Sequence, residues 1–147
     1  MNTNVLIYKN LDFTNKIDIL EFLASKLYKE NLVEAEYIKA ILERELEYPT
    51  ALPGEVRVAI PHCEHILVKS PAIAIGVLNN EVNFQKMDDP EITLGVQIII
   101  MLAIDNPQYY AEMLQKILVF KISYKRFESF LQTYSWLNTE KTRAKNV

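Results

Sequence analysis

The sequence predicts an α/β (or α+β) fold in which helices pack around one apolar sheet. Two segments with helical spacing of apolar residues come first, three extended apolar segments follow, and helical spacing returns after the last of them. Elements in this order form layers around a common core. The 147 residues are enough for one domain with a sizeable core.

The first third of the chain is predicted to hold a short strand and two helices. Residues 4–8 are a candidate strand, and Thr14 or Asn15 is a candidate N-cap for a helix over about 15–29. The apolar face of this helix follows the helical period at Ile17, Leu20, Leu23, Ala24, Leu27 and Tyr28.

A second helix is predicted over about 34–47. Its apolar stripe consists of Ile38, Ile41, Leu42 and Leu46. Arg44 falls on the opposite side, among Glu43, Glu45 and Glu47. The helix is expected to end near Tyr48, because Pro49 disfavours helical geometry in the residue before it.

The middle of the chain predicts the sheet. Residues 49–54, with two prolines and a glycine, are expected to be a loop. Three strands are predicted after it, at about 56–60, 72–78 and 96–104. Asn79-Asn80 is a candidate turn into a short return strand at 82–84, followed by a loop over 86–91. The segment 96–104 is the most apolar and is expected at the centre of the sheet.

The last part of the chain predicts helices again. Asp105 or Asn106 is expected to cap a helix with Pro107 in its first turn. Its apolar face consists of Tyr110, Met113, Leu114, Ile117 and Leu118. A further helical piece is predicted over about 124–134. We expect a single domain over 1–147, with its core at about 5–137 and a polar tail over 138–147 that frays.

Composition excludes several classes of protein. The net charge of −3 and the pI near 5.4 argue against a nucleic-acid-binding protein, which usually carries a basic face. The longest apolar run, 98–104, is too short to span a bilayer, and the first residues do not resemble a signal peptide. The single cysteine cannot form an internal disulfide. These features favour a cytoplasmic protein.

The candidate site is the segment that follows the strand at 56–60. Both histidines and the only cysteine lie there, as His62, Cys63 and His65. The histidines could be loop residues without a special role. A metal site is disfavoured because the chain offers no second pair of His or Cys ligands. A Cys63 nucleophile paired with His62 is disfavoured because adjacent residues at a strand end point to opposite faces.

The fourth interpretation makes His62 a phosphoryl acceptor. A neutral imidazole has a lone pair on one nitrogen, while the other nitrogen can donate to a backbone carbonyl. Phosphoryl transfer depends mainly on positioning and charge stabilisation. An exposed ring beside neutralising donors would suffice, with no metal or cofactor.

Several blocks of sequence resemble the enzyme IIA proteins of the sugar phosphotransferase system, within the fructose/mannitol superfamily and its galactitol-type branch. The resemblance spans about residues 10–135. It rests on Arg44-Glu45, Tyr48-Pro49-Thr50, the Val58–Cys63 segment Val-Ala-Ile-Pro-His-Cys, residues 68–78, residues 101–107 and residues 112–117.

This resemblance implies a fold, a function and a site. The fold would be a mixed five-stranded sheet flanked by helices on both faces. The activity would be that of a cytoplasmic phosphotransferase, accepting a phosphoryl group from the histidine phosphocarrier protein HPr. The group would pass to a cysteine of enzyme IIB, and sugar would enter through the membrane protein enzyme IIC. His62 matches the phosphorylated histidine, through Nε2, and Arg44 matches an arginine near the active site. From the sequence alone, Arg44 is equally well explained as a solvated helix charge among glutamates.

One position departs from the family pattern. Many members carry a second histidine early in the helix after the central strand, and Tyr110 matches that position. A phenol can donate a hydrogen bond to phosphate, but it does not carry a positive charge near pH 7. Tyr110 is either a supporting donor or only a core residue of its helix.

Three functional hypotheses follow. The first is the IIA component for galactitol or a related sugar or polyol. The second is a regulatory protein that senses its phosphorylation state without feeding a transporter, and the third is a metal-binding module. For the first, an apolar docking rim is expected around His62, with Leu52, Ile66 and Tyr110 as candidates. His65 is expected to be a loop residue, and the less favoured alternative is that it lines the site.

Overall fold

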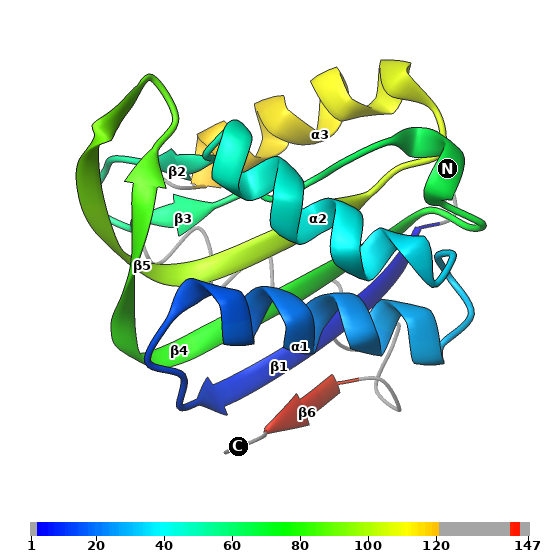
Figure 1. The fold of residues 1–147 in the computed structure, drawn as a ribbon, viewed down its shortest axis with the longest axis horizontal. Helices are drawn as coiled ribbons and strands as arrows, with labels where there is room; N and C mark the ends of the chain where they lie inside the picture. Colours follow the sequence, from blue (N-terminus) through cyan, green and yellow to red (C-terminus); the bar gives the residue numbers. More distant parts are fainter. Residues whose placement is uncertain (1–2, 121–141, 145–147) are drawn as a thin grey trace.

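Two long antiparallel strands, β4 (Ala72–Lys86) and β5 (Asp89–Ala103), form the centre of the sheet (Figure 1). The structure is a computed structural model that describes residues 3–120 and 142–144. Among these residues the strand order is β2-β3-β5-β4-β1-β6. The segment predicted at 96–104 is therefore confirmed as an interior strand, with neighbours on both sides.

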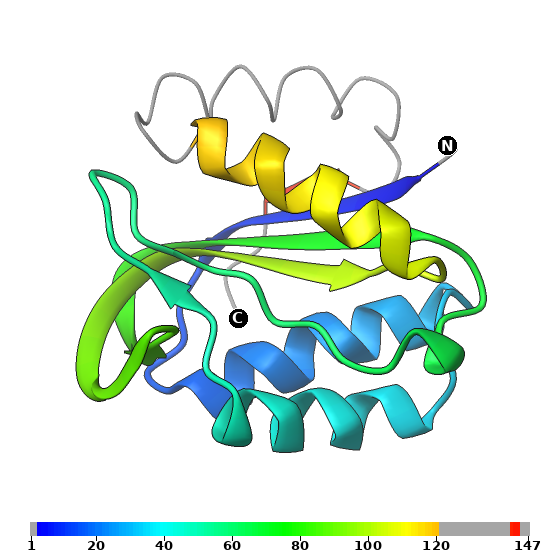
Figure 2. The same cartoon turned by 90° about the horizontal axis from the view of Figure 1, so that it is seen from above.

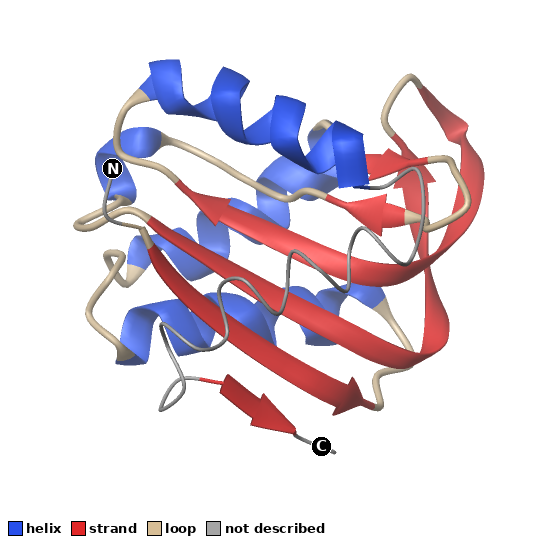
Figure 3. Cartoon of the chain, turned by 180° about the vertical axis from the view of Figure 1, so that it is seen from behind, coloured by secondary structure: helices blue, strands red, loops and turns tan. Residues whose placement is uncertain are grey.

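The outer strands make the sheet mixed. β1 (Asn4–Leu11) runs parallel to β4, and the two-residue strand β3 (Val58–Ala59) runs parallel to β5. β2 (Ala51–Leu52) pairs antiparallel with β3. β1 to β5 confirm the mixed five-stranded sheet, and β6 (Thr142–Ala144) adds a further parallel strand beside β1 (Figure 3).

Helices cover both faces of the sheet, which confirms the predicted fold class. α1 (Lys16–Lys29) and α2 (Glu36–Glu47) lie on one face, and α3 (Pro107–Phe120) lies on the other (Figure 2). Alternation along the strands produces two apolar layers. Leu6, Ala74 and Met101 face the layer with α1 and α2, whereas Ile7, Ile75 and Ile100 belong to the layer with Met113 of α3.

The helices begin and end close to the predicted residues. Asn15, and not Thr14, is the N-cap of α1, because its Oδ1 accepts a hydrogen bond from the Asp18 N–H at 3.0 Å. At α3, Asn106 Oδ1 accepts from the Gln108 N–H at 3.0 Å, so Asn106 has the predicted capping role. Among the described residues, no helix is long and apolar enough to cross a membrane.

The predicted helix faces need correction at three residues. Ile17 and Tyr28 of α1 and Leu46 of α2 were expected to be buried, but their side chains are exposed. In α2 the buried stripe is Tyr37, Ile41 and Glu45, at intervals of four residues. The stripe is thus rotated away from Leu46, and Glu45 belongs to the core rather than to the charged side.

The predicted turn at Asn79-Asn80 was wrong. β4 continues through these residues to Lys86, with an irregularity in register between Val77 and Val82. The hairpin turns at Met87 and Asp88 instead, so most of the expected loop over 86–91 belongs to strands. Pairing with β5 along the whole strand outweighs the local turn preference of two asparagines.

Three further boundaries differ. The loop expected over 49–54 contains β2, and only Val58 and Ala59 of the segment 56–60 form a strand. The expectation that the whole tail over 138–147 frays was wrong for Thr142–Ala144, which pair with β1. The helix predicted at 124–134 lies outside the described residues, as do the side chains of Leu114, Ile117 and Leu118.

Candidate active site

His62 lies just past β3, in an extended segment that leads into the short 3₁₀ helix η1 (His65–Leu67). Hydrogen bonds fix the backbone on the approach to this residue. The Ile60 N–H donates to Thr50 Oγ1 at 3.0 Å, and the Leu102 N–H of β5 donates to the Pro61 carbonyl oxygen at 2.9 Å. The side chain of His62 is therefore presented from a backbone that is anchored to the sheet.

The His62 ring is held through one of its two nitrogens. Nδ1 lies 2.8 Å from the carbonyl oxygen of Ile60. A carbonyl can only accept, so this geometry assigns the proton to Nδ1 and leaves a lone pair on Nε2. The residue is half-buried rather than sealed in the core. The arrangement suits a nucleophilic Nε2.

The surroundings favour the neutral form of this ring. Burial lowers the pKa of His62, the hydrogen bond with Ile60 opposes this by raising it, and the positive charge of Arg44 lowers it further. With a pKa below the ordinary value of 6.5, the imidazole is mostly uncharged at neutral pH. The lone pair on Nε2 is then available.

Tyr110 of α3 packs beside His62. The two ring centroids are 5.2 Å apart with the planes inclined at 47°, and the Tyr110 hydroxyl donates to the Cys63 carbonyl oxygen at 3.1 Å. Burial, as the main cause, raises the pKa of Tyr110 to about 12, so the phenol keeps its proton. Tyr110 ties the start of α3 to the segment that carries His62.

Arg44 reaches the same site from α2. It is exposed, as its place off the apolar stripe predicted, and its guanidinium carbon lies 4.4 Å from the ring centroid of Tyr48. Arg44, His62 and Tyr110 line one pocket of about 190 Å³, together with Cys63, Glu64, His65 and Pro107. The structure thus brings together the three residues that the sequence singled out.

Cys63 and His65 have different environments. Burial is the main cause that raises the pKa of the Cys63 thiol to about 12, so the thiol stays protonated and is a poor nucleophile at neutral pH. His65, expected to be a loop residue, begins η1 and lines the pocket. Among the described residues, no group of three or more His, Cys, Asp or Glu side chains is placed to hold a metal ion.

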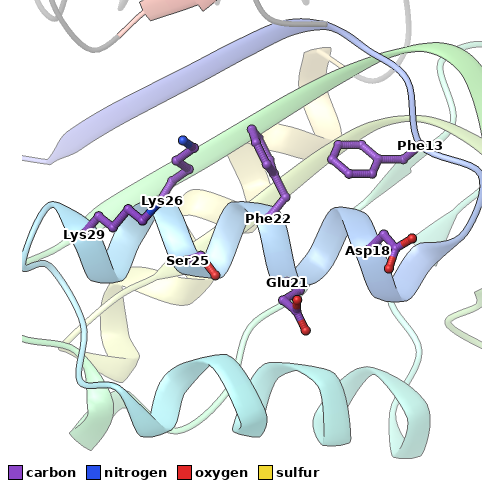
Figure 4. A pocket seen from close by; sticks show the side chains of 7 residues that line it. All are labelled: Phe13, Asp18, Glu21, Phe22, Ser25, Lys26 and Lys29. Atoms are coloured by element: carbon purple, nitrogen blue, oxygen red, sulfur yellow. The ribbon is translucent and has the colours of Figure 1, made fainter. Parts of the chain in front are cut away.

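A larger hollow of about 350 Å³ lies along α1 (Figure 4). Its lining contains neither histidine nor cysteine. The Lys26 ammonium lies 5.2 Å from the ring centroid of Phe22 and 5.8 Å from that of Tyr8, in cation–π geometry. The chemistry that the side chains support is at His62 rather than in this larger hollow.

Sequence reasoning missed the buried polar residues behind the site. Glu45 is 2% exposed and Thr50 is 4% exposed, and they are bonded to each other. Tyr37 is fully buried and its hydroxyl donates to the Leu102 carbonyl oxygen at 2.9 Å. The sequence did indicate the burial of two of these residues: Tyr37 and Glu45 each lie four residues from Ile41, which places all three on one helix face.

Comparison with known proteins identifies the family to which this chain belongs. Residues 1–134 match the family described as "Phosphoenolpyruvate-dependent sugar phosphotransferase system, EIIA 2". The chain belongs to this family, and it is therefore an EIIA phosphotransferase component.

Individual relatives agree with this family. The galactitol-specific EIIA component of Escherichia coli K12 is 32% identical over 114 residues, covering 77% of this chain and 75% of that protein. The fold is also similar to mannitol enzyme IIA of Escherichia coli, solved in complex with phosphorylated enzyme IIB, with a TM-score of 0.60, 21% identity, and coverage of 88% and 94%.

A second similar structure is the nitrogen regulatory protein IIA-Ntr of Neisseria meningitidis. Its TM-score is 0.62 and its identity is 23%, with coverage of 83% of this chain and 82% of that protein. At this level of identity the likeness of either solved structure shows the fold alone.

The buried setting of His62 generates a prediction about its titration. In a ¹H–¹⁵N NMR titration, the imidazole of His62 should titrate with a pKa below 6.5, because burial disfavours the charged ring. The resonance that disappears in a His62→Gln variant identifies the ring. A pKa at or above 6.5 would contradict this description of the site.

Proposed function

We propose that this chain is a cytoplasmic phosphocarrier that accepts a phosphoryl group from HPr on Nε2 of His62. It then passes the group to a cysteine of enzyme IIB, for uptake of galactitol or a related sugar or polyol through the membrane protein enzyme IIC. One observation carries the proposal: Nδ1–H of His62 donates to the Ile60 carbonyl, so the lone pair is on Nε2 of a half-buried ring.

The transfer steps follow from this arrangement. The Nε2 lone pair attacks the phosphorus of phosphohistidine on HPr, forming the new P–N bond as the bond to the HPr imidazole breaks. Positive charge then develops on the His62 ring, and the Ile60 carbonyl stabilises it through the retained Nδ1–H bond. A thiolate of enzyme IIB attacks next, forming a P–S bond while the P–N bond breaks.

Two side chains support the reaction at His62 in this proposal, one at the phosphoryl group and one at the imidazole. The Arg44 guanidinium, which lines the pocket with His62, pairs with phosphoryl oxygens and offsets their charge. Tyr110 packs against the His62 ring and fixes the Cys63 carbonyl, in place of the second histidine of many family members. Its protonated phenol adds no positive charge, so Arg44 supplies the cationic stabilisation.

Exposed apolar side chains provide a docking rim for the two carrier proteins. Ile66 in η1 is 73% exposed, and Tyr48, which stacks on Arg44, is 54% exposed. Both sit beside residues of the pocket, where the exposed charges of Glu43, Arg44, Glu47 and Glu64 also lie. The two apolar side chains offer contacts that different partners can use in turn. Of the earlier candidates, Tyr110 lines the pocket, whereas Leu52 packs against the apolar layer with Met113.

A second candidate function is regulation by phosphorylation state. The fold is compatible with it, because a nitrogen regulatory protein, IIA-Ntr of Neisseria meningitidis, has a similar fold. The two functions differ in what happens after phosphorylation. Mixed with a galactitol enzyme IIB, a phosphorylated carrier would lose its phosphoryl group to it, whereas a sensor would keep the group. Genes for enzymes IIB and IIC beside the gene for this chain would also favour the carrier, and their absence would favour the sensor.

Phosphorylation should occur at His62. Incubation with phosphorylated HPr should give one acid-labile phosphoryl group, found by intact-protein mass spectrometry and lost in His62→Ala. The matched variant His65→Ala should still be labelled, because His65 does not share the Ile60 hydrogen bond. Failure to label the unaltered chain, under conditions that label a known EIIA, would defeat the proposal.

Arg44→Ala should slow phosphoryl transfer from HPr to His62 by ~10- to 100-fold, the loss expected for a charge-assisted hydrogen bond to phosphate. Rapid-quench kinetics would measure it. Lys39→Ala is the control, because Lys39 is an exposed cation on α2 that pairs with Glu43. Equal rates for the two variants would remove Arg44 from the site.

A further inference from the structure

Behind the site, Glu45 of α2 and Thr50 form a buried polar pair. The Glu45 carboxylate accepts two hydrogen bonds from Thr50, from its N–H to Oε2 and from its hydroxyl to Oε1, both at 2.8 Å. Both residues are almost completely buried. A buried carboxylate is tolerated only with such partners, and here both hydrogen bonds come from one residue.

Thr50 extends the contact to Ile60. The Ile60 N–H donates to Thr50 Oγ1 at 3.0 Å and lies 3.4 Å from the Thr50 carbonyl oxygen. Since the hydroxyl gives its only proton to Glu45, its oxygen is free to accept from Ile60. The ionised Glu45 thus sets the direction of both hydrogen bonds at the hydroxyl.

Ile60 then connects this pair to the reacting ring. Its N–H is bonded to Thr50, and its carbonyl oxygen accepts from Nδ1–H of His62. The chain of contacts is Glu45 to Thr50, Thr50 to Ile60, and Ile60 to His62. Moving the Thr50 hydroxyl would therefore change the position of the backbone that orients the imidazole.

We propose that Glu45 and Thr50 are positioning residues for phosphoryl transfer at His62, acting through the Ile60 backbone to hold the ring with Nε2 free. The inference rests on the proposed phosphocarrier function. Neither side chain touches the phosphoryl group. Their effect is on the orientation of the imidazole, so it is expected in the rate of transfer and not in the binding of HPr.

This arrangement makes the site sensitive to pH. Burial is the main cause that raises the pKa of Glu45 to about 7; the hydrogen bonds from Thr50 and the charge of Lys16 at the start of α1 oppose it. A protonated Glu45 would donate to the Thr50 hydroxyl oxygen, so the hydroxyl would lose Glu45 as the acceptor of its own proton and would have to reorient beside the Ile60 N–H. Transfer should therefore slow as the pH falls through about 7, above the range in which His62 itself is protonated.

Stability should respond in the opposite direction. A carboxyl group whose pKa is raised on folding stabilises the folded state at low pH, and this stabilisation is lost as the pH rises through the folded pKa. Acidification through about 7 should thus increase the contribution of Glu45 to stability while slowing transfer. A purely structural role for Glu45 would give no loss of rate in this range.

The test uses the full chain with phosphorylated HPr as donor, between pH 6 and pH 8.5. Glu45→Gln removes the ionisation: the amide oxygen can still accept from the Thr50 N–H, while the amide NH2 faces the Thr50 hydroxyl as a donor, as a protonated Glu45 would. Thr50→Val removes the hydroxyl. At pH 8 each should lower kcat by ~10-fold or more with KM for HPr unchanged. The step near pH 7 should be absent from the Glu45→Gln profile.

Two control variants and one direct measurement complete the experiment. Thr50→Ser keeps the hydroxyl and should transfer at the unaltered rate, as should Glu36→Gln, which changes an exposed carboxyl on the same helix. If Thr50→Val does not fold, ¹⁵N shifts of the His62 ring in Glu45→Gln report the Nδ1–H bond without any transfer. Shifts that indicate a weakened Nδ1–H hydrogen bond support the proposal, and ring shifts equal to those of the unaltered chain overturn it.

The outcomes separate this proposal from the function on which it rests. No labelling of the unaltered chain would refute the phosphocarrier function. Normal labelling of the unaltered chain, with equal rates and equal pH profiles for Glu45→Gln and Glu36→Gln, would refute only the positioning role of Glu45 and Thr50.

Discussion

The hydrogen bond from Nδ1–H of His62 to the Ile60 carbonyl is the interaction on which the site depends. It fixes the tautomer, so Nε2 carries the lone pair, and it fixes the orientation of the ring. Burial lowers the pKa of the same ring and keeps it uncharged near pH 7. Without this bond, either nitrogen could react and the ring could rotate.

The fold supplies what this bond requires. β3 is only two residues long, yet it pairs with β5, and the Leu102 N–H extends the pairing to Pro61. The Tyr37 hydroxyl donates to the carbonyl oxygen of the same Leu102, linking α2 to this strand. One pocket next to the end of β3 is lined by His62 together with Arg44 from the C-terminal half of α2 and Tyr110 from the start of α3.

Local patterns predicted the helices and the position of His62, whereas features that depend on distant partners were missed. Helical spacing and the Asn15 cap are set within a few residues, so α1 and α2 could be placed from the sequence. The turn expected at Asn79-Asn80 failed because pairing with β5 determines β4. Glu45 was placed among surface charges because its partner, Thr50, lies beyond the end of the helix.

The nitrogen of His62 that carries the phosphorus shows whether the Ile60 hydrogen bond leaves Nε2 as the reacting atom. The protein would be labelled with ¹⁵N, phosphorylated by HPr, and studied by two-dimensional NMR, in which the ring shifts and the ³¹P–¹⁵N coupling distinguish the two positions. We predict phosphorus on Nε2 of His62, with the Nδ1 proton protected from exchange by Ile60. Phosphorus on Nδ1, or a rapidly exchanging Nδ1 proton, would contradict the account.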